Sequence, residues 1–451
     1  MENPNKRKNK DGGFEANVMA ILDSTGVRED RDLHDDRLSF LEAVRAGALL
    51  SGTPSPPSWK MFDAIFQILR ESNSLELAMA SYQLLIDLDK HYPRVYLKSL
   101  DRSNSSSIGV DELVVVKEAW SPFILDSDSI HFEGGGTCKN SFHVDSLPIE
   151  NLLLFQYLVS ILEADFLPRH ALYKESLDWA LFRESLLNML LGSRRLSFKT
   201  LVKECITIIS KRCHQHTGIS FRELKDATNL TGSAKMAHDC DVALSFSATQ
   251  IERETCSSMQ SFMSLIMELD MIRKEADLHG LTSRADGLRI PLLEIILDEL
   301  TYNTDYISPF LEVFSEPRWK LEIVLQYFSK YSLKNSIRTR RAKESPDDAT
   351  FAGILSYFSA AVSIKNIAKK TSLEVAQLLL AHAFQAYLSL QHDQKHNASF
   401  AEKIGSTSQY EICNALISAF QNIRKIDEDS DITPFQKEAL FTAASIVSQK
   451  S

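Results

Sequence analysis

Apolar residues recur at helical spacing along most of this chain. Residues 59–70 show it most plainly, because their large apolar side chains keep the 3.6-residue period of one helix face: Phe62, Ile65, Phe66 and Leu69. A similar segment follows at once, so we predict a pair of helices over residues 59–70 and 75–90. An earlier segment places four apolar residues on a broad helical stripe: Leu38, Leu41, Val44 and Leu49.

Longer segments rich in Leu, Phe and Ile continue this pattern. They predict helices over residues 149–164, 170–191, 198–213, 258–277, 290–300 and 318–331. No segment sustains the alternation of a strand, and no fixed repeat period is found. With only 16 Gly and 13 Pro, the chain has few residues for turns. We therefore predict an all-α fold whose successive helices stack as an irregular α-solenoid or bundle without a strict repeat.

Two helix starts carry the spacing of a capping box. Thr371 with Glu374, and Thr433 with Gln436, each place a hydroxyl three residues before a group that can bond back to the cap. Pro434 follows Thr433 and suits a first helical position, where its missing N–H needs no partner. Both boxes precede apolar runs, so we predict helices starting at these places.

Segments rich in small and polar residues divide the helices. We predict mobile loops near residues 101–109, 126–146, 228–257, 340–350 and 391–407. Residues 1–13 are polar and basic, which predicts a disordered tail. Residues 14–451 are then expected to form a single elongated all-helical domain.

The charge balance and the cysteines limit the partners and the cellular compartment that we expect for this chain. The formal net charge is −10, so the body of the chain repels nucleic-acid phosphates unless its basic groups are concentrated in one place. The six cysteines show no paired framework and the N-terminus lacks the apolar region of a secretory signal, which predicts reduced intracellular thiols. No uncharged apolar run approaches the ~18 residues of a membrane span.

Histidines and cysteines gather at two places without forming a known metal motif. The run "CHQH" at 213–216, with Cys205 before it and "HDC" at 238–240, matches no zinc spacing. His392 and His396 have i, i+4 spacing but lack the glutamate of a metalloprotease helix. A buried cysteine and solvated histidines explain these residues better, so we expect no metal site.

An acidic run near the C-terminus imitates a calcium loop. Its carboxylates fall at the ligand positions of such a loop: Asp427, Asp429, Asp431 and Glu438. However, Ile432 stands where the loop needs Gly, and Pro434 would start a helix inside it. An acidic linker before a helix is the better interpretation. Because no nucleophile, P-loop or metalloprotease signature appears either, we expect no enzyme and no cofactor.

Two basic runs remain as candidate sites. Five cations without an acidic neighbour form the first, which is a candidate contact for a partner or for nucleic acid: Lys334, Arg338, Arg340, Arg341 and Lys343. The second lies in the N-terminal tail and has the form of a nuclear import signal, although a solubilising tail explains it as well: Lys6, Arg7, Lys8 and Lys10.

Several long blocks resemble a known plant family. They are "ILDSTGVREDRDLHDDRLSFLEAVRAG" (21–47), "KEADLHGLTSRADGLRIPLLEIILDELTY" (274–302), "WKLEIVLQYFSKY" (319–331) and "IRTRR" (337–341). The chain is similar over these blocks to the negative regulators of systemic acquired resistance, also called suppressors of inducible immunity. The resemblance runs from about residue 14 to about residue 447 and is lost at residues 101–109, 126–146, 214–257 and 391–407.

This resemblance implies a nuclear, armadillo/HEAT-like helical protein without catalytic activity. It implies a non-SMC subunit of the structural-maintenance-of-chromosomes (SMC) five/six complex, paired with another non-SMC subunit as a heterodimer. That complex serves DNA repair by homologous recombination, and the family represses plant defence (pathogenesis-related) genes. The alternative is a repressor that contacts promoter DNA directly through the basic run from Lys334 to Lys343. Since acidic Glu344, Asp347 and Asp348 follow that run, contact with an acidic partner surface fits it better than base readout.

Overall fold

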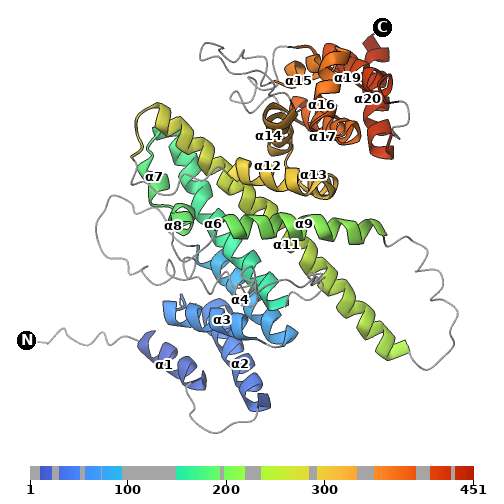
Figure 1. Ribbon diagram of the computed structural model, residues 1–451. Helices are drawn as coiled ribbons and strands as arrows, with labels where there is room; N and C mark the ends of the chain where they lie inside the picture. The colour runs from blue at the N-terminus through green and yellow to red at the C-terminus, as the bar shows by residue number, and fades with distance from the viewer. Residues whose placement is uncertain are drawn as a thin grey trace, which may run out of the picture. The chain divides into compact units, whose positions relative to one another are not determined.

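The computed structural model describes residues 11–22, 30–50, 56–72, 74–93, 149–192, 198–218, 235–283, 292–332, 350–392, 407–427 and 432–450. Every regular element in these ranges is an α-helix or a short 3₁₀- or π-helix, and none is a strand (Figure 1). The predicted all-α fold is therefore confirmed. The solenoid character of the stack stays a prediction.

The chain divides into two compact units. One is formed by Met1–Ile208 with Phe221–Leu292, and the other by Ile209–Ser220 with Leu293–Ser451. Each unit has its own core of Leu, Ile and Phe side chains. The prediction of one elongated domain over residues 14–451 stays a prediction.

The first unit contains the helices of the N-terminal half. They are α1 (Asp11–Leu22), α2 (Asp30–Arg45), the π-helix η1 (Ala46–Leu50), α3 (Trp59–Glu71), α4 (Leu75–His91), α6 (Ile149–Ser176), α7 (Ala180–Arg183), α8 (Leu186–Gly192), the start of α9 (Phe198–Gly218) and α11 (Lys235–Leu278).

The predicted pair α3 and α4 is confirmed. Helix α3 begins where the Ser58 hydroxyl accepts a hydrogen bond from the N–H of Met61, which satisfies one of the unpaired donors of the first turn. All four apolar positions named from the sequence, Phe62, Ile65, Phe66 and Leu69, are buried. The two helices pack against each other and against α6.

Helix α6 is the centre of the first unit. Between Leu152 and Val159 every side chain is buried, so this half of the helix is surrounded on all sides. Helix α11 runs parallel to it: the rings of Phe155 and Phe262 meet edge to face at 6.0 Å, and further along His170 Nε2 lies 3.3 Å from the Glu268 carboxylate.

Two sequence predictions for the first unit are wrong. Residues 149–164 and 170–191 were expected to be separate helices, but α6 continues past Pro168 to Ser176, and the remainder breaks into α7 and α8. Proline only removes one hydrogen bond and kinks a helix, and here Pro168 lies on an exposed face where that loss is tolerated. Residues 228–257 were expected to be a loop, yet α11 is helical from Lys235 onward and buries Ile251 and Thr255.

The second unit contains the C-terminal helices. They are α12 (Leu292–Tyr302), the 3₁₀-helix η4 (Thr304–Tyr306), α13 (Ile307–Val313), α14 (Pro317–Tyr327), the π-helix η5 (Phe328–Ser332), α15 (Phe351–Tyr357), α16 (Ala361–Ala368), α17 (Leu373–His392), α19 (Gln409–Arg424) and α20 (Pro434–Lys450). Helix α14 is its central helix, since every side chain from Trp319 to Leu325 is buried, and it packs against α17.

The two predicted capping boxes have different outcomes. At α20 the box is confirmed: the N–H of Thr433 donates to Gln436 Oε1 at 2.8 Å, and the N–H of Gln436 donates to the Thr433 hydroxyl at 3.3 Å. At α17 the box predicted for Thr371 is wrong by one residue, because the Ser372 hydroxyl accepts from the N–H of Val375. Thr371 is buried instead. Adjacent hydroxyl residues can each cap, and the sequence does not choose between them.

Within the described residues, no single helix is long and apolar enough to cross a membrane. Helices α15 and α16 meet that criterion only when taken together, and they are bent by 97° relative to each other.

Candidate functional site

Both predicted basic sites lie outside the residues that the structure describes. This holds for Lys334, Arg338, Arg340, Arg341 and Lys343, and also for Lys6, Arg7, Lys8 and Lys10. The predicted loops at 101–109 and 126–146 lie outside them too, as do residues 340–349 and 393–406 of the two later loops. The roles given to these residues stay predictions.

The described residues on either side of the first basic run meet in the core of the second unit. Helix η5 ends at Ser332, and α15 begins at Phe351 after Thr350, whose hydroxyl accepts from the N–H of Gly353. Phe328 of η5 packs edge to face on Phe358, with ring centroids 5.7 Å apart, and both rings are fully buried. The two ends of the segment that carries the basic run are thus fixed to one core.

Lys330 of η5 has an acidic environment. Its Nζ lies 3.0 Å from the Asp298 carboxylate and 3.7 Å from the Glu294 carboxylate, both on α12. The lysine side chain is 29% exposed, so these pairs are partly shielded from solvent. The last described cation before the basic run therefore stabilises contact between η5 and α12.

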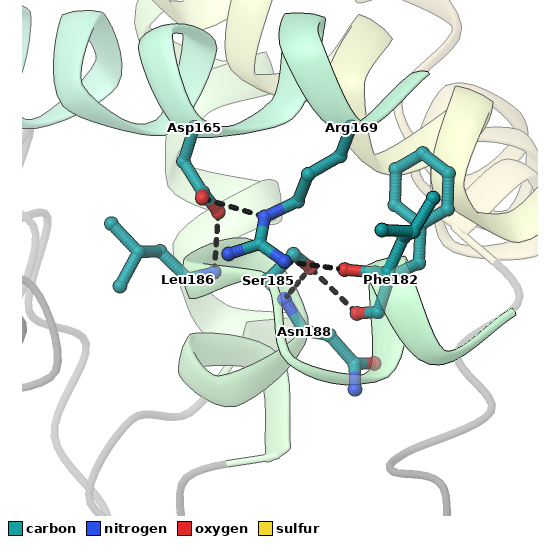
Figure 2. A network of polar contacts seen from close by, with 7 residues as sticks. Asp165, Arg169, Phe182, Ser185, Leu186 and Asn188 are labelled. Atoms are coloured by element: carbon teal, nitrogen blue, oxygen red, sulfur yellow. Dashed lines mark hydrogen bonds and ion pairs between the residues drawn. The ribbon is translucent and has the colours of Figure 1, made fainter. Parts of the chain in front are cut away.

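The most extensive polar arrangement described is a corner where α6, α7 and α8 meet, which we call the polar corner (Asp165, Arg169, Ser185, Asn188 and Arg273). Asp165 and Arg169, one helical turn apart on α6, are both buried. Arg169 Nε donates to Asp165 Oδ1 at 2.7 Å, and Arg169 Nη1 donates to the carbonyl of Leu181 at 2.7 Å. The N–H of Leu186 donates to Asp165 Oδ2 at 2.7 Å (Figure 2). Both carboxylate oxygens therefore have donors.

Ser185 and Asn188 extend the polar corner to α11. The Ser185 hydroxyl donates to the carbonyl of Phe182 and accepts from the N–H of Asn188 (Figure 2). Asn188 Oδ1 accepts from Arg273 Nη2 at 2.6 Å, and the Arg273 guanidinium lies over the Trp179 ring, 5.5 Å from its centroid. The corner thus fixes the start of α8 against α6 and α11.

The chemistry of the polar corner is that of a structural network. Its carboxylate is held by a guanidinium and a backbone N–H, and its hydroxyl has both a donor and an acceptor as neighbours. A nucleophile needs an adjacent general base, and no such pair appears in this group. The arrangement positions helices and satisfies buried polar groups.

Two neighbouring side chains on α9, the half-buried Glu204 carboxyl and the buried Cys205 thiol, have raised pKa values. Burial raises the pKa of the Glu204 carboxyl to about 7. The Cys205 thiol is fully buried, and burial, with a smaller contribution from Glu204, raises its pKa far above the ordinary value. Since the thiolate is the reactive form, Cys205 is a structural residue.

The Cys and His residues noted in the sequence are described only in part. Cys205 is buried on α9, but the side chains of Cys213, His214, His216, His238 and Cys240 are not described. His392 is the last residue of α17, without a described side chain, and His396 lies outside the described ranges. Among the residues that are described, no group of three or more His, Cys, Asp or Glu side chains is placed to hold a metal ion.

The calcium-loop imitation is described in part. Asp427 follows α19, while Asp429 and Asp431 lie outside the described residues. Pro434 is the first residue of α20, which begins inside the would-be loop. An acidic linker that leads into a helix is thus the supported interpretation.

His382 on α17 is the buried titratable group of the second unit that differs most from its ordinary state. It is 1% exposed, and neither ring nitrogen has a hydrogen-bond partner among the described residues. Its ring lies against Phe435 of α20, with centroids 4.4 Å apart. Burial, and to a smaller extent the charge of Lys320, lowers the pKa of His382 to about 3. The imidazole is therefore neutral at physiological pH and is not tuned for proton transfer there.

Sequence reasoning did not find the polar corner. The i, i+4 spacing of Asp165 and Arg169 was a usable signal for an ion pair on one helix face. Nothing in the sequence indicates that Leu186, Asn188 and Arg273 come to the same place.

The described residues define an all-α protein whose buried polar groups hold helices together. Its sequence matches the SNI1 middle domain over residues 94–147 and 136–316, and the SNI1 C-terminal domain over residues 332–451. It is 39% identical over 458 residues to the "Negative regulator of systemic acquired resistance SNI1" of Arabidopsis thaliana, with 98% of this chain and 96% of that protein covered. No solved structure matches. The chain belongs to the SNI1 family.

Proposed function

We propose that this chain is a negative regulator of systemic acquired resistance, as its Arabidopsis relative is named. The observation that carries the proposal is the 39% identity over 98% of the chain, with both family domains present. The test is loss of the gene product in the plant of origin. Pathogenesis-related transcripts should then rise without infection, and unchanged transcripts would contradict the proposal.

The proposed mode of action is that of a non-enzymatic nuclear scaffold. The chain would be a subunit of the SMC five/six complex, bound to another non-SMC subunit, serving homologous-recombination repair and repressing defence genes. Support comes from the resemblance of residues 21–47, 274–302 and 319–331 to the family. The two helical units add support, because stacked helices offer long surfaces for protein partners.

The partner proposal is tested by affinity purification of the full chain from plant nuclei. We expect SMC five/six subunits to be recovered at levels comparable to the chain itself. Purification of a folded chain without any subunit of that complex would refute the proposal. Replacing Lys6, Arg7, Lys8 and Lys10 by Ala should leave the chain outside the nucleus if the tail is the import signal.

Direct contact with promoter DNA is the alternative, and it rests on the basic run alone. Phosphate contacts make binding depend on salt by about one unit of log–log slope for each neutralised phosphate. DNA affinity at low salt that falls when Arg338, Arg340 and Arg341 become Ala would favour this alternative. Affinity that is absent or unchanged would exclude it.

A further inference from the structure

The C-terminal half of α6 carries an apolar stripe on its surface, which we call the α6 stripe (Ala164, Leu167, Pro168, Ala171 and Leu172). All five residues are exposed, with Leu167 at 59% and Leu172 at 41%. Their spacing of three and four residues places them along one face of the helix. Exposed apolar side chains that occur singly are ordinary, whereas five on one helix face form a continuous surface.

The opposite face of the same segment is fully engaged. Asp165 and Arg169 belong to the polar corner. The rings of Phe166 and Tyr173 pack against the ring of Phe182, with centroid distances of 5.0 Å and 5.5 Å. The stripe is therefore the side of α6 that the described residues of the first unit leave uncovered. Residues Leu152 to Val159, on the same helix, have no such side, since all of them are buried.

Pro168 adds a polar feature to the stripe. It has no N–H, so it cannot donate the hydrogen bond that the carbonyl of Ala164 would ordinarily receive from the residue four positions on. Ala164 is itself exposed and belongs to the stripe. The carbonyl of Ala164 therefore lacks its usual helical donor. A lysine or arginine side chain on a partner could donate to it.

The ends of the stripe are acidic on balance. Glu163 lies at one end and Glu175 at the other, against one lysine, Lys174. A second copy of this chain would bring like charges together, and the overall net charge of −10 also opposes self-association. A partner with basic residues beside its apolar face is complementary to this surface.

We propose that the α6 stripe binds an amphipathic helix of a partner protein. The apolar face of that helix lies along Leu167 and Leu172, the small side chains of Ala164 and Ala171 allow it a close approach, and Lys or Arg residues flank it. This is the helix-on-helix mode of recognition, in which residues spaced three and four apart provide the anchors. The inference rests on the proposed scaffold function and assigns it a surface.

The first experiment compares two double variants of the full chain. Leu167→Glu with Leu172→Glu adds two charges to the stripe, and Val362→Glu with Phe441→Glu adds the same charges at exposed apolar positions of the second unit, 72% and 75% exposed. Both should keep the helical circular dichroism and melting temperature of the wild type. Partner recovery from plant nuclei should fall about tenfold or more for the stripe variant alone.

The second experiment identifies what lies on the stripe. A photo-crosslinking phenylalanine derivative at position 172, compared with the same residue at position 441, is activated in nuclei and the joined peptides are sequenced. The expected product at position 172 is a partner segment with apolar residues at helical spacing and flanking Lys or Arg. Joining to a second copy of this chain, to lipid or to no protein would overturn the inference.

The two proposals fail in different ways. If the wild type recovers the SMC five/six subunits and the stripe variant recovers them equally well, the α6 stripe is not the binding surface and the scaffold function stands. If the folded wild type recovers none of them, the scaffold function itself is wrong.

Discussion

The cores of the two units accommodate buried polar side chains in different ways. In the first unit, Gln156 and Asp165 on α6 are held by hydrogen bonds from the neighbouring helices. In the second unit, His382 on α17 lies near Lys320 of the central helix α14 without a hydrogen bond to either ring nitrogen among the described residues. Asp165 and His382 are both almost completely buried, so burial alone does not explain the difference.

The difference indicates two ways to place polar groups in a helical core. A satisfied network fixes which helices meet, because removing one member leaves its partner buried and unpaired. A neutral histidine avoids the cost of a buried charge by giving up its proton, and its ring then packs as an aromatic group against Phe435. We therefore expect that replacing these buried polar side chains lowers the free energy of unfolding strongly in the first unit and only slightly in the second at neutral pH.

The largest effect is expected at the polar corner. Asp165→Ala leaves the Arg169 guanidinium buried without its carboxylate, which should lower the free energy of unfolding of the first unit by about 3–5 kcal/mol. Hydrogen exchange of peptides from α6 to α8 measures it. Glu163→Ala, two residues away, is the matched control and should change stability by less than about 0.5 kcal/mol. A loss at Asp165 as small as that of the control would remove the claim that the corner holds the unit together.

A pH-dependent effect is expected in the second unit. The pKa of His382 falls from an ordinary 6.5 to about 3 on folding. Below pH 6.5, His382 is therefore protonated in the unfolded chain but stays neutral in the folded chain. Stability is fully present above that pH and declines between 6.5 and 3. Between pH 7 and 5 the wild type should lose about 2 kcal/mol through this group.

The variant His382→Leu isolates that contribution. At pH 7 its free energy of unfolding in urea should equal or exceed that of the wild type. Between pH 7 and 5 it should lack the decline of about 2 kcal/mol, because that decline comes from the titration of His382 alone. His279, which is exposed, provides the control variant His279→Leu, in which the decline should persist. Equal pH dependence in the wild type and in His382→Leu would show that His382 is not neutral in the fold.

A smaller loss is expected where α6 meets α4 and α11. Gln156 Oε1 accepts from the Tyr82 hydroxyl at 3.1 Å, and Gln156 Nε2 donates to the Thr255 hydroxyl at 2.8 Å and to the carbonyl of Ile251 at 3.0 Å. Gln156→Leu should cost about 1–2 kcal/mol in urea unfolding, because these groups lose their partner in the core. The control variant Gln83→Leu, at an exposed position, should leave the free energy of unfolding nearly unchanged. A comparable loss in that variant would contradict the claim that the buried hydrogen bonds of Gln156 cause the effect.

The smallest expected effect is a gain. Leu177 directly follows α6 and has a φ of 54°, a left-handed conformation that costs a non-glycine residue about 1 kcal/mol or more. Leu177→Gly should therefore raise the unfolding free energy by up to about 1 kcal/mol. Lys174→Gly, inside the same helix, should lower it by a similar amount, about 1 kcal/mol. If both variants are destabilised alike, the strain at Leu177 is not real.

Much of the fold could be predicted from local pattern. The helices α3 and α4, the start of α20 at Thr433 and Pro434, and the helix over residues 258–277 all follow from spacing within one segment. The errors occurred where local signals conflict with packing. Pro168 suggested a break that α6 does not make, and small polar residues concealed the first turns of α11.

The candidate site could be predicted less well, because its parts come together only through the fold. Asp165 and Arg169 are neighbours on a helix, but their carbonyl and N–H partners at Leu181 and Leu186 depend on how the chain turns after Leu177. The α6 stripe is hidden in the sequence for a related reason. Its leucines look like core residues until the structure shows which face of α6 is covered.

The central claim is that this chain acts as a helical scaffold through a surface that its own core does not use. The most direct measurement is the molar ratio of SMC five/six subunits to this chain after purification from plant nuclei. We compare the wild type, Leu167→Glu with Leu172→Glu, and Val362→Glu with Phe441→Glu. We expect comparable ratios for the wild type and the control, and a ratio lower by about tenfold or more for the stripe variant. Equal ratios in all three folded proteins, or no such subunit with the wild type, would contradict it.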